Sequence, residues 1–179
     1  MNGLIIDSSS ATPFAALLTN KIAPEIKVLT SSKELAESVA QLTDSADSID
    51  YIAVGCGPGS YTGTRAGVAL AKSLAFAKKI PLYTFPSPLA FCPPREGTTL
   101  FALEMAGGTY FLLHLTVNNG IIAEVTYEKD LPLPTAQSSD YTILESHPIT
   151  LASIELFIQK KIHSKACSEI DKTAIIYLR

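Results

Sequence analysis

The feature that most constrains this chain is a glycine-rich turn between an apolar strand and an apolar helix. Residues 55–65 read Gly-Cys-Gly-Pro-Gly-Ser-Tyr-Thr-Gly-Thr-Arg. The continuous apolar run 51–54 before them is typical of a strand covered on both faces. Residues 62–79 after them carry few charges and predict a buried helix. The unpaired N–H groups of a helix start therefore follow directly after a strand, and such groups can bind an anion.

The turn has two interpretations. In the first, it binds phosphate, because glycines allow close approach to the backbone and two hydroxyls add donors; the residues are Gly57, Gly59, Ser60 and Thr62. In the second, it only starts a closely packed helix. The pattern is not a Walker A loop, because no Gly-Lys-Ser/Thr follows. It is not the dinucleotide fingerprint either, because Ser60 stands where the third glycine should be.

Asp7 presents a similar choice at the end of the first predicted strand, where Ser8 and Ser9 follow it. A carboxylate at a strand end can hold a magnesium-bound nucleotide or order a water molecule. It can equally accept a hydrogen bond from its own backbone two residues on, as an Asx turn. The residues alone leave both interpretations open.

The remaining sequence predicts further strands and helices in two lobes. Ser31 and Glu34 have the spacing of a capping box and predict a helix over 32–43. A proline-rich segment predicts a boundary near residues 93–98, between an N-terminal lobe, 1–96, and a C-terminal lobe, 97–179. Strands are expected at 3–7, 14–19, 27–30, 51–54, 82–83, 99–104, 110–117, 121–127 and 141–144, and a last helix at 150–162.

Composition excludes several classes of protein. Hydrophobic residues make up 47% of the 179 and charged residues 17%, so the chain can bury a core. A net charge of −3 provides no basic field to hold nucleic acid unaided. Three cysteines without a Cys-x-x-Cys spacing indicate a reduced, cytoplasmic protein, and no signal peptide is expected. Residues 105–123 are uncharged, but Asn119-Gly120 within them predicts a hairpin and not a membrane span.

The sequence offers little for a catalytic centre. A nucleophile elbow, Gly-x-Ser-x-Gly, fails because Pro58 stands two residues before Ser60. The histidines His114, His147 and His163 lie far apart, so no zinc or iron site is predicted. We therefore predict neither a catalytic residue nor a bound metal.

Several segments resemble one known family. Residues 57–65 closely resemble the Gly-Pro-Gly-Ser-Phe-Thr-Gly-x-Arg signature of the TsaB (YeaZ) family, and residues 71–75 continue it. Residues 4–9 are similar to the opening Ile-Asp-Thr-Ser strand of that family, and 177–179 to its Tyr-Leu-Arg. The resemblance covers the first lobe throughout and the second in outline.

The resemblance implies an α/β protein with an actin-like, Hsp70-like ATPase fold of two ribonuclease-H-like lobes, the second reduced. It also implies a role in placing threonylcarbamoyl on N6 of adenosine 37 of tRNA. TsaB proteins are the non-catalytic dimerisation partners of the transferase TsaD; the subunit TsaE joins them, and tRNA is met only through the complex. We therefore expect no enzyme activity, no membrane and no cofactor. Homodimerisation of the isolated chain and weak ATP or ADP binding at the partner interface stay open.

Two alternatives belong to other classes. One is an ATP-binding or ATP-hydrolysing protein of the same fold, with Asp7 on magnesium and the glycine-rich turn on phosphate. The other is a glycoprotease-like peptidase, against which the failed nucleophile elbow and the missing metal ligands count. Residues 105–110 lack the Arg and Glu of a second-lobe motif in the family, and this favours a scaffold.

The family's contact surface uses two helices of the first lobe, which predicts a partner interface here. Glycine and alanine recur every four residues along 62–79 and would let another helix approach closely. The predicted interface residues are Leu35, Val39, Leu42, Gly63, Arg65, Gly67, Ala71, Lys72 and Ala75. The predicted vestigial nucleotide site comprises Asp7, Ser8, Ser9, Gly57, Gly59, Ser60 and Thr62.

Overall fold

The chain divides into two compact units. The computed structural model describes residues 1–19, 23–105, 108–131, 141–143, 148–166 and 176. Unit 1 comprises Met1–Ser87 and Lys165–Tyr177, and unit 2 comprises Pro88–Ser164. The predicted lobes, 1–96 and 97–179, differ from this division at both ends of unit 2.

Hydrogen bonds explain both differences. The Thr150 N–H donates to the Ala90 carbonyl at 2.7 Å, and the Ser153 hydroxyl donates to the Cys92 carbonyl, so residues 90–92 belong with unit 2. The Ile176 N–H donates to the Cys56 carbonyl at 2.7 Å, so the chain returns to unit 1 near its C-terminal end. A proline cluster marked the region of the boundary, but the contacts place it after Ser87.

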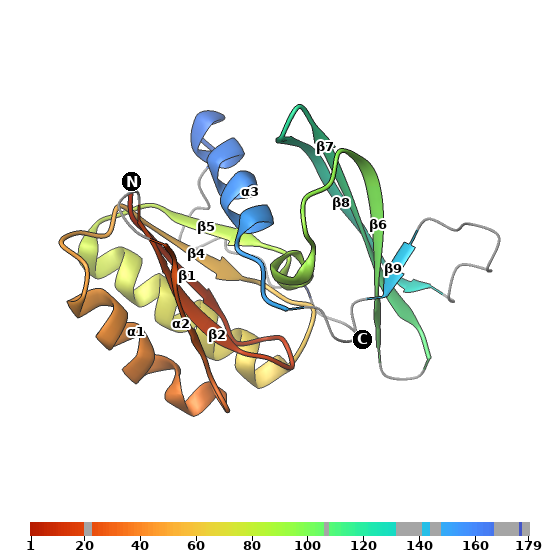
Figure 1. The fold of residues 1–179 in the computed structure, drawn as a ribbon. Helices are drawn as coiled ribbons and strands as arrows, with labels where there is room; N and C mark the ends of the chain where they lie inside the picture. The colour runs from red at the N-terminus through yellow and green to blue at the C-terminus, as the bar shows by residue number, and fades with distance from the viewer. Residues whose placement is uncertain (20–22, 106–107, 132–140, 144–147, 167–175, 177–179) are drawn as a thin grey trace. The chain divides into compact units, whose positions relative to one another are not determined.

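Unit 1 is a five-stranded mixed sheet in the order β3-β2-β1-β4-β5. β2 pairs antiparallel with β1 and with β3, whereas β1, β4 and β5 run parallel (Figure 1). The parallel neighbours are joined by helical crossovers, as parallel pairing requires. The strands are β1 (Gly3–Asp7), β2 (Phe14–Leu18), β3 (Glu25–Val28), β4 (Tyr51–Gly55) and β5 (Leu82–Phe85); the helices are η1 (Ser32–Glu34), α1 (Leu35–Asp44) and α2 (Tyr61–Lys78).

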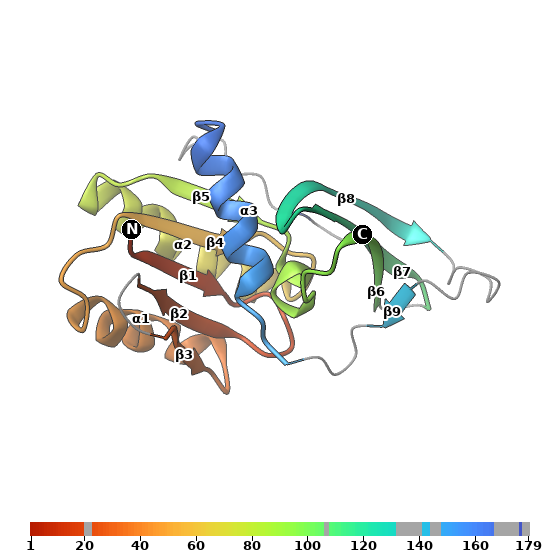
Figure 2. The same cartoon turned by 45° about the horizontal axis from the view of Figure 1, so that its top comes forward.

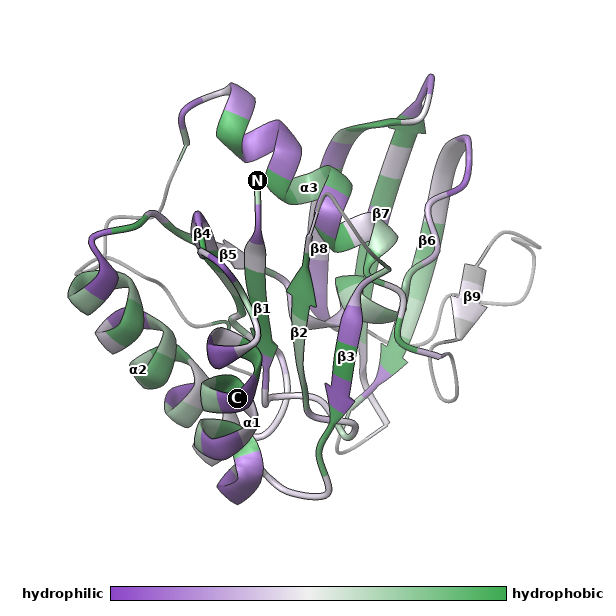
Figure 3. Cartoon of the chain, turned by 60° about the vertical axis from the view of Figure 1, so that its left-hand side comes forward, coloured by the Kyte–Doolittle hydropathy of each residue, from purple (hydrophilic) through white to green (hydrophobic). Residues whose placement is uncertain are grey.

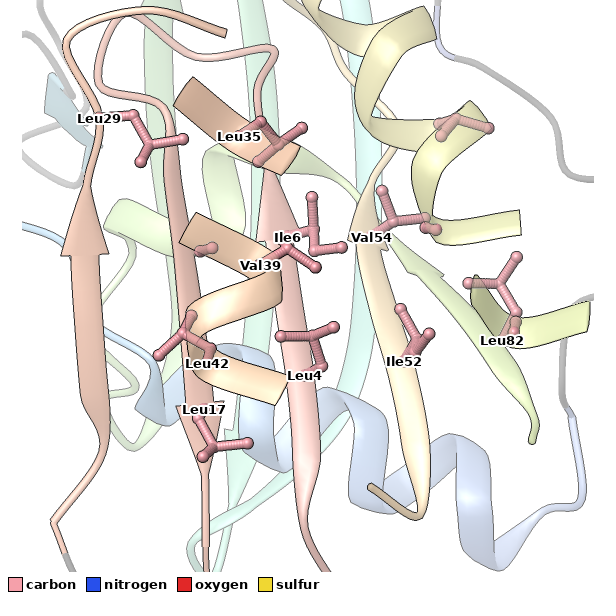
Figure 4. Close-up of a cluster of buried hydrophobic side chains, with 14 residues drawn as sticks. Leu4, Ile6, Leu17, Leu29, Leu35, Val39, Leu42, Ile52, Val54 and Leu82 are labelled. Carbon is pink, nitrogen blue, oxygen red and sulfur yellow. The ribbon is translucent and has the colours of Figure 1, made fainter. Parts of the chain in front are cut away.

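The core of unit 1 lies between one face of this sheet and the two helices α1 and α2, which run along the same side of it (Figure 2). Leucine, isoleucine and valine side chains from every second position of β1 and β4 meet three apolar positions of α1 (Figure 4). Apolar and polar positions alternate along α1, as Figure 3 shows by colour. The labelled members of this cluster are Leu4, Ile6, Leu17, Leu29, Leu35, Val39, Leu42, Ile52, Val54 and Leu82.

The start of α1 differs from the predicted capping box. The Glu34 carboxylate accepts hydrogen bonds from the N–H and hydroxyl of Thr30, and the Glu34 N–H donates to the Ser31 carbonyl at 3.2 Å. No side chain caps the first residue of α1. A turn of 3₁₀-helix, η1, precedes the α-helix, so the acidic side chain reaches one residue further back than a capping box requires.

Unit 2 is a four-stranded sheet in the order β8-β7-β6-β9. The predicted hairpin is confirmed: β7 ends at Asn118, β8 begins at Ile121, and Asn119 and Gly120 have φ values of 53° and 71°. Such left-handed angles suit the two-residue turn that Asn-Gly favours. The elements are η2 (Ser87–Phe91), which spans the division, β6 (Gly97–Glu104), β7 (Tyr110–Asn118), β8 (Ile121–Leu131), β9 (Tyr141–Ile143) and α3 (Ala152–His163).

The two sheets share a topology. β6 and β7 pair antiparallel, as do β7 and β8, while β9 runs parallel to β6. This is the arrangement of β1 to β4 in unit 1, without the fifth strand in the described part of unit 2. Both units therefore have the ribonuclease-H-like order that was predicted. None of the described helices is long and apolar enough to cross a membrane.

Candidate functional site

The candidate site lies where the parallel strands of unit 1 end. β1 ends at Asp7, β4 at Gly55 and β5 at Phe85, and these ends meet at one edge of the sheet. In α/β sheets, ligand sites form outside the carboxyl ends of parallel strands. The site is thus built from the turn after β1, the glycine-rich turn after β4, and the serine that follows β5.

Asp7 is fully buried and forms the centre of the cluster. Its Oδ1 accepts hydrogen bonds from the Ser9 N–H at 3.0 Å, the Ser9 hydroxyl at 2.8 Å and the Ser87 hydroxyl at 3.0 Å. Its Oδ2 is buried and has no hydrogen-bond partner in the described part of the chain. Burial raises the pKa of Asp7 above its ordinary 3.8, although hydrogen bonds from Ser9, Ser87 and Ser10 oppose this effect.

Ser87 is a member of this cluster that the sequence did not reveal. Its hydroxyl accepts a hydrogen bond from the Gly57 N–H at 3.0 Å, and its own N–H donates to the Gly57 carbonyl at 2.9 Å. A serine between two prolines gives no functional signal in a sequence. Only the pairing of β4 with β5 brings it beside Asp7.

Several donors of the glycine-rich turn bind the protein's own chain. The Ser60 N–H donates to the Ser9 carbonyl at 2.7 Å, and the Ser60 hydroxyl accepts from the Gly63 N–H at 3.2 Å as the N-cap of α2. A Cβ atom at Gly59 would lie 2.1 Å from the Ser9 carbonyl oxygen, so the two turns are in direct backbone contact. The β1–β2 turn therefore lies directly against the glycine-rich turn at Gly59 and Ser60.

The structure brings together most of the predicted nucleotide site but does not leave it open. Asp7, Ser8 and Ser9 are buried, while Ser60 and Thr62 are exposed. An actin-like ATPase fold implies a magnesium-bound nucleotide here. The donor set does not fit this group, because Asp7 is fully buried and its Oδ1 already accepts three hydrogen bonds, and no group of three or more His, Cys, Asp or Glu among the described residues could hold a metal ion. The N–H groups of Gly57, Ser60 and Gly63 in the turn also have internal partners.

Most residues of the predicted partner interface are buried within unit 1 of the chain itself. Leu35, Val39 and Leu42 are at most 3% exposed and belong to the core of unit 1. The small-residue stripe of α2 also faces inward: Ala71 and Ala75 are fully buried in the same core. Glycine and alanine recur every four residues because α2 packs closely on its own sheet. A helix that packs closely against another protein would show the same spacing of small residues.

Close packing of α2 against the turn after β1 explains its glycines. A Cβ atom at Gly63 would lie 1.9 Å from the Ser8 carbonyl oxygen, and one at Gly67 would lie 2.4 Å from the Ser8 hydroxyl oxygen. That hydroxyl donates to the Gly63 carbonyl at 2.7 Å. Leucine at position 67 would therefore disturb the fold of unit 1 itself, and cannot serve as a test of association.

The opposite face of α2 is exposed and carries small residues as well as basic ones. Arg65 is exposed there, with its guanidinium 5.2 Å from the centre of the Tyr61 ring, and Lys72 is half-buried. Phe76 is 75% exposed, the most of the large hydrophobic side chains described. We define the outer face of α2 as Thr62, Ala66, Ala69, Ser73, Phe76 and Ala77, all of which are exposed.

The two cysteines that the structure describes are both buried. Cys56 is buried and its Sγ donates to the Phe85 carbonyl at 3.1 Å. Burial raises the pKa of the Cys92 thiol strongly, which keeps it protonated. His114 lies on β7, 3.3 Å from the Glu128 carboxylate, and His163 ends α3. His147 lies outside the described residues.

Two units with the strand order of ribonuclease H define an actin-like fold. Over 98% of this chain, the structure is similar to "YeaZ from Pseudomonas aeruginosa", with a TM-score of 0.77, 17% identity and 100% of that chain covered. It is also similar to an uncharacterized protein "with similarity to peptidase YEAZ from Pseudomonas aeruginosa", with a TM-score of 0.75, 18% identity and 99% of each chain covered. The predicted resemblance to the TsaB (YeaZ) fold is confirmed.

The sequence comparison points to the same group of proteins. Residues 18–90 match the family model of TsaD, tRNA N6-adenosine threonylcarbamoyltransferase. No curated protein sequence matches the chain. The fold and the family match together support a relationship to the proteins that form N6-threonylcarbamoyladenosine.

Proposed function

We propose that the chain is a non-catalytic dimerisation subunit of the complex that forms N6-threonylcarbamoyladenosine at position 37 of tRNA. In this proposal it binds a TsaD subunit through the outer face of α2. The family match over residues 18–90 and the YeaZ-like fold support the process, and the exposed face of α2 supports the mode of binding. TsaE would join a larger cytoplasmic assembly, and tRNA would be met through the complex.

The observation that carries the proposal is the composition of the outer face. Its alanines and serine put little side chain between two helix backbones, so a partner helix can approach closely. The Ser73 hydroxyl donates to the Ala69 carbonyl at 2.9 Å, which satisfies it within the helix. Phe76 offers a large exposed side chain beside these small residues, the kind of anchor that contributes most to a protein interface.

A non-catalytic role is supported by the closed site of unit 1. Asp7 Oδ1 and the N–H groups of Gly57, Ser60 and Gly63, which belong to the predicted nucleotide site and its turn, have internal partners. Both cysteines that the structure describes are buried. Weak ATP or ADP binding in the assembled complex would then require groups from the TsaD subunit.

The test is light scattering of the chain alone and mixed with the TsaD protein of its own organism. We expect a one-to-one complex, in place of a monomer or homodimer of the isolated chain. Ala69→Arg puts a long charged side chain in the centre of the outer face and is expected to weaken the complex by at least about tenfold. Ala152→Arg, at an exposed alanine that starts α3, is the matched control and leaves binding unchanged.

Each result bears on a separate part of the proposal. A complex that Ala69→Arg does not weaken would place the contact on another surface of the chain. Absence of any complex at micromolar concentrations would contradict the scaffold role. Circular dichroism of both variants verifies that the fold is retained.

A further inference from the structure

A hydrogen bond connects the Asp7 carboxyl group to Ser87, the residue at which the chain leaves unit 1. We propose that Asp7 is an internal structural acid that fixes this exit, in place of the magnesium–nucleotide contact that an actin-like fold implies at the end of β1. The inference is independent of the proposed partner, because every residue in it belongs to unit 1.

The hydrogen bonds of Asp7 support a structural role. All three donors on Oδ1 come from Ser9 and Ser87, at 2.8 to 3.0 Å, and the carboxyl group is fully buried. A Cβ atom at Gly55 would lie 2.5 Å from Oδ1, so the end of β4 closes the site from another side. A metal ion would have to displace these contacts to bind Oδ1, and Oδ2 is buried as well.

Ser87 connects the acid to the exit of the chain. It is the last residue of unit 1 before unit 2 begins, and it makes two backbone-directed hydrogen bonds with Gly57 as well as one with Asp7. The returning chain meets the same place, because the Ile176 N–H donates to the Cys56 carbonyl. A Cβ atom at Gly57 would lie 2.6 Å from the Ile176 carbonyl oxygen, and the φ of Gly57 is 94°. The outgoing and returning chain are thus both fastened to the turn that Asp7 supports.

The charge environment favours the neutral form of the acid. Hydrogen bonds, strand pairing and close approach join Asp7 to four uncharged residues: Ser9, Phe14, Gly55 and Ser87. No cation lies among these residues to stabilise a carboxylate. A buried carboxyl group without a cation keeps its proton more firmly in the folded chain than in the unfolded chain.

The sign of the pH dependence follows from this difference. The folded state binds more protons than the unfolded state above the ordinary pKa of 3.8, so stability is lost as the pH rises toward the raised pKa of the folded state. Asparagine has the shape of the neutral acid and does not titrate. Its advantage over aspartate should therefore grow with pH.

The experiment compares unfolding of the full chain with Asp7→Asn between pH 5 and pH 8. We expect the ratio of their unfolding constants to change in favour of the variant as the pH rises, by up to about tenfold per pH unit. Asp44→Asn, at an exposed carboxylate that ends α1, is the matched control and shows no such trend. A ratio that is constant with pH, or that moves toward the wild type, would overturn the proposal.

Two further measurements separate the structural role from the nucleotide site. Ser87→Ala should speed amide hydrogen exchange at Gly57 at least about tenfold, because the hydrogen bond to that N–H is lost. Ser73→Ala on the outer face of α2 is its control. Magnesium with ATP should leave the melting temperature of the wild type unchanged. If it raises that temperature for the wild type but not for Asp7→Asn, Asp7 is a ligand and the proposal is wrong.

Discussion

Alanine at position 67 tests how closely α2 lies on the turn after β1. The Cβ atom would come within 2.4 Å of the Ser8 hydroxyl oxygen, which must move and give up its hydrogen bond to the Gly63 carbonyl. Removing that hydroxyl with Ser8→Ala leaves the new Cβ only ordinary contacts, at 3.7 Å from the Ser8 Cβ and 3.8 Å from the Ile6 Cγ2. The two substitutions should therefore be strongly coupled.

The magnitudes follow from three terms. Displacing the hydroxyl costs about 1 kcal/mol for the hydrogen bond and about 1 kcal/mol for an unfavourable rotamer. Alanine in place of glycine within a helix returns about 1 kcal/mol. Gly67→Ala alone should thus destabilise the chain by about 1 kcal/mol, from the terms above. In the Ser8→Ala background only the helix term stays, so the same change should stabilise by about 1 kcal/mol.

The assay is urea unfolding of the four proteins in the cycle, followed by far-UV circular dichroism because the chain has no tryptophan. A coupling of about 2 kcal/mol is expected. Gly63→Ala serves as the control, since its Cβ atom would meet the Ser8 backbone oxygen at 1.9 Å, which Ser8→Ala cannot remove. Equal costs of Gly67→Ala in both backgrounds would refute the packing described for α2.

Two other predictions concern α1. Leu42→Ala should lower the free energy of unfolding by about 2–5 kcal/mol, because Leu42 is fully buried in the core. The same substitution at an interface residue that is exposed in the free chain would lower it by less than about 0.5 kcal/mol, and chemical denaturation distinguishes the two values. The pKa of Glu34 lies below its ordinary 4.5, mainly because of the hydrogen bond from the Thr30 hydroxyl and to a smaller extent because of that from the Thr30 N–H. Thr30→Val removes the hydroxyl, so an NMR titration should find the pKa of Glu34 raised toward its ordinary value. The lowered pKa stabilises the fold above pH 4.5, and the contribution disappears as the pH falls. An unchanged pKa of Glu34 in the variant would show that this contact does not form in solution.

Local patterns were sufficient for most of the secondary structure. The strand Gly3–Asp7 agrees residue for residue, and the helix expected over 62–79 begins and ends one residue earlier, as α2. Asn119-Gly120 marked the β7–β8 turn because few dipeptides adopt two successive left-handed conformations easily. β3 was expected at 27–30 but lies at Glu25–Val28, because its exposed edge position leaves no alternating burial pattern to fix its register.

Local sequence patterns could not predict whether the apolar faces of α1 and α2 point toward the chain's own sheet or toward a partner. Leu35, Val39 and Leu42 have the spacing of one helix face, and a face that covers its own sheet has the same spacing as one that covers a partner. The small residues of α2 presented the same ambiguity. Only the three-dimensional packing shows that the stripe faces inward and that Phe76 faces solvent.

The sequence predicted some residues of the candidate site but not Ser87. Asp7 and the glycine-rich turn stood out because each has few uses at a strand end, and the Asx-turn interpretation of Asp7 is confirmed by the Ser9 N–H on its Oδ1. Ser87 could not be found, because its role depends on β5 pairing beside β4 some 30 residues from the turn. Long-range pairing of this kind leaves no mark on the neighbouring residues.

The return of the chain at Ile176 affects how unit 1 is made in the cell. Residues 1–87 leave the ribosome before Ile176, whose N–H donates to the Cys56 carbonyl and which is synthesised 89 residues after Ser87. At about 5–20 residues per second, that interval lasts about 4–18 seconds. During this time the nascent unit 1 must hold its sheet without its last hydrogen-bonded segment, while unit 2 is synthesised. Co-translational folding therefore depends on the contacts made within residues 1–87, and the returning segment adds its contribution only afterwards.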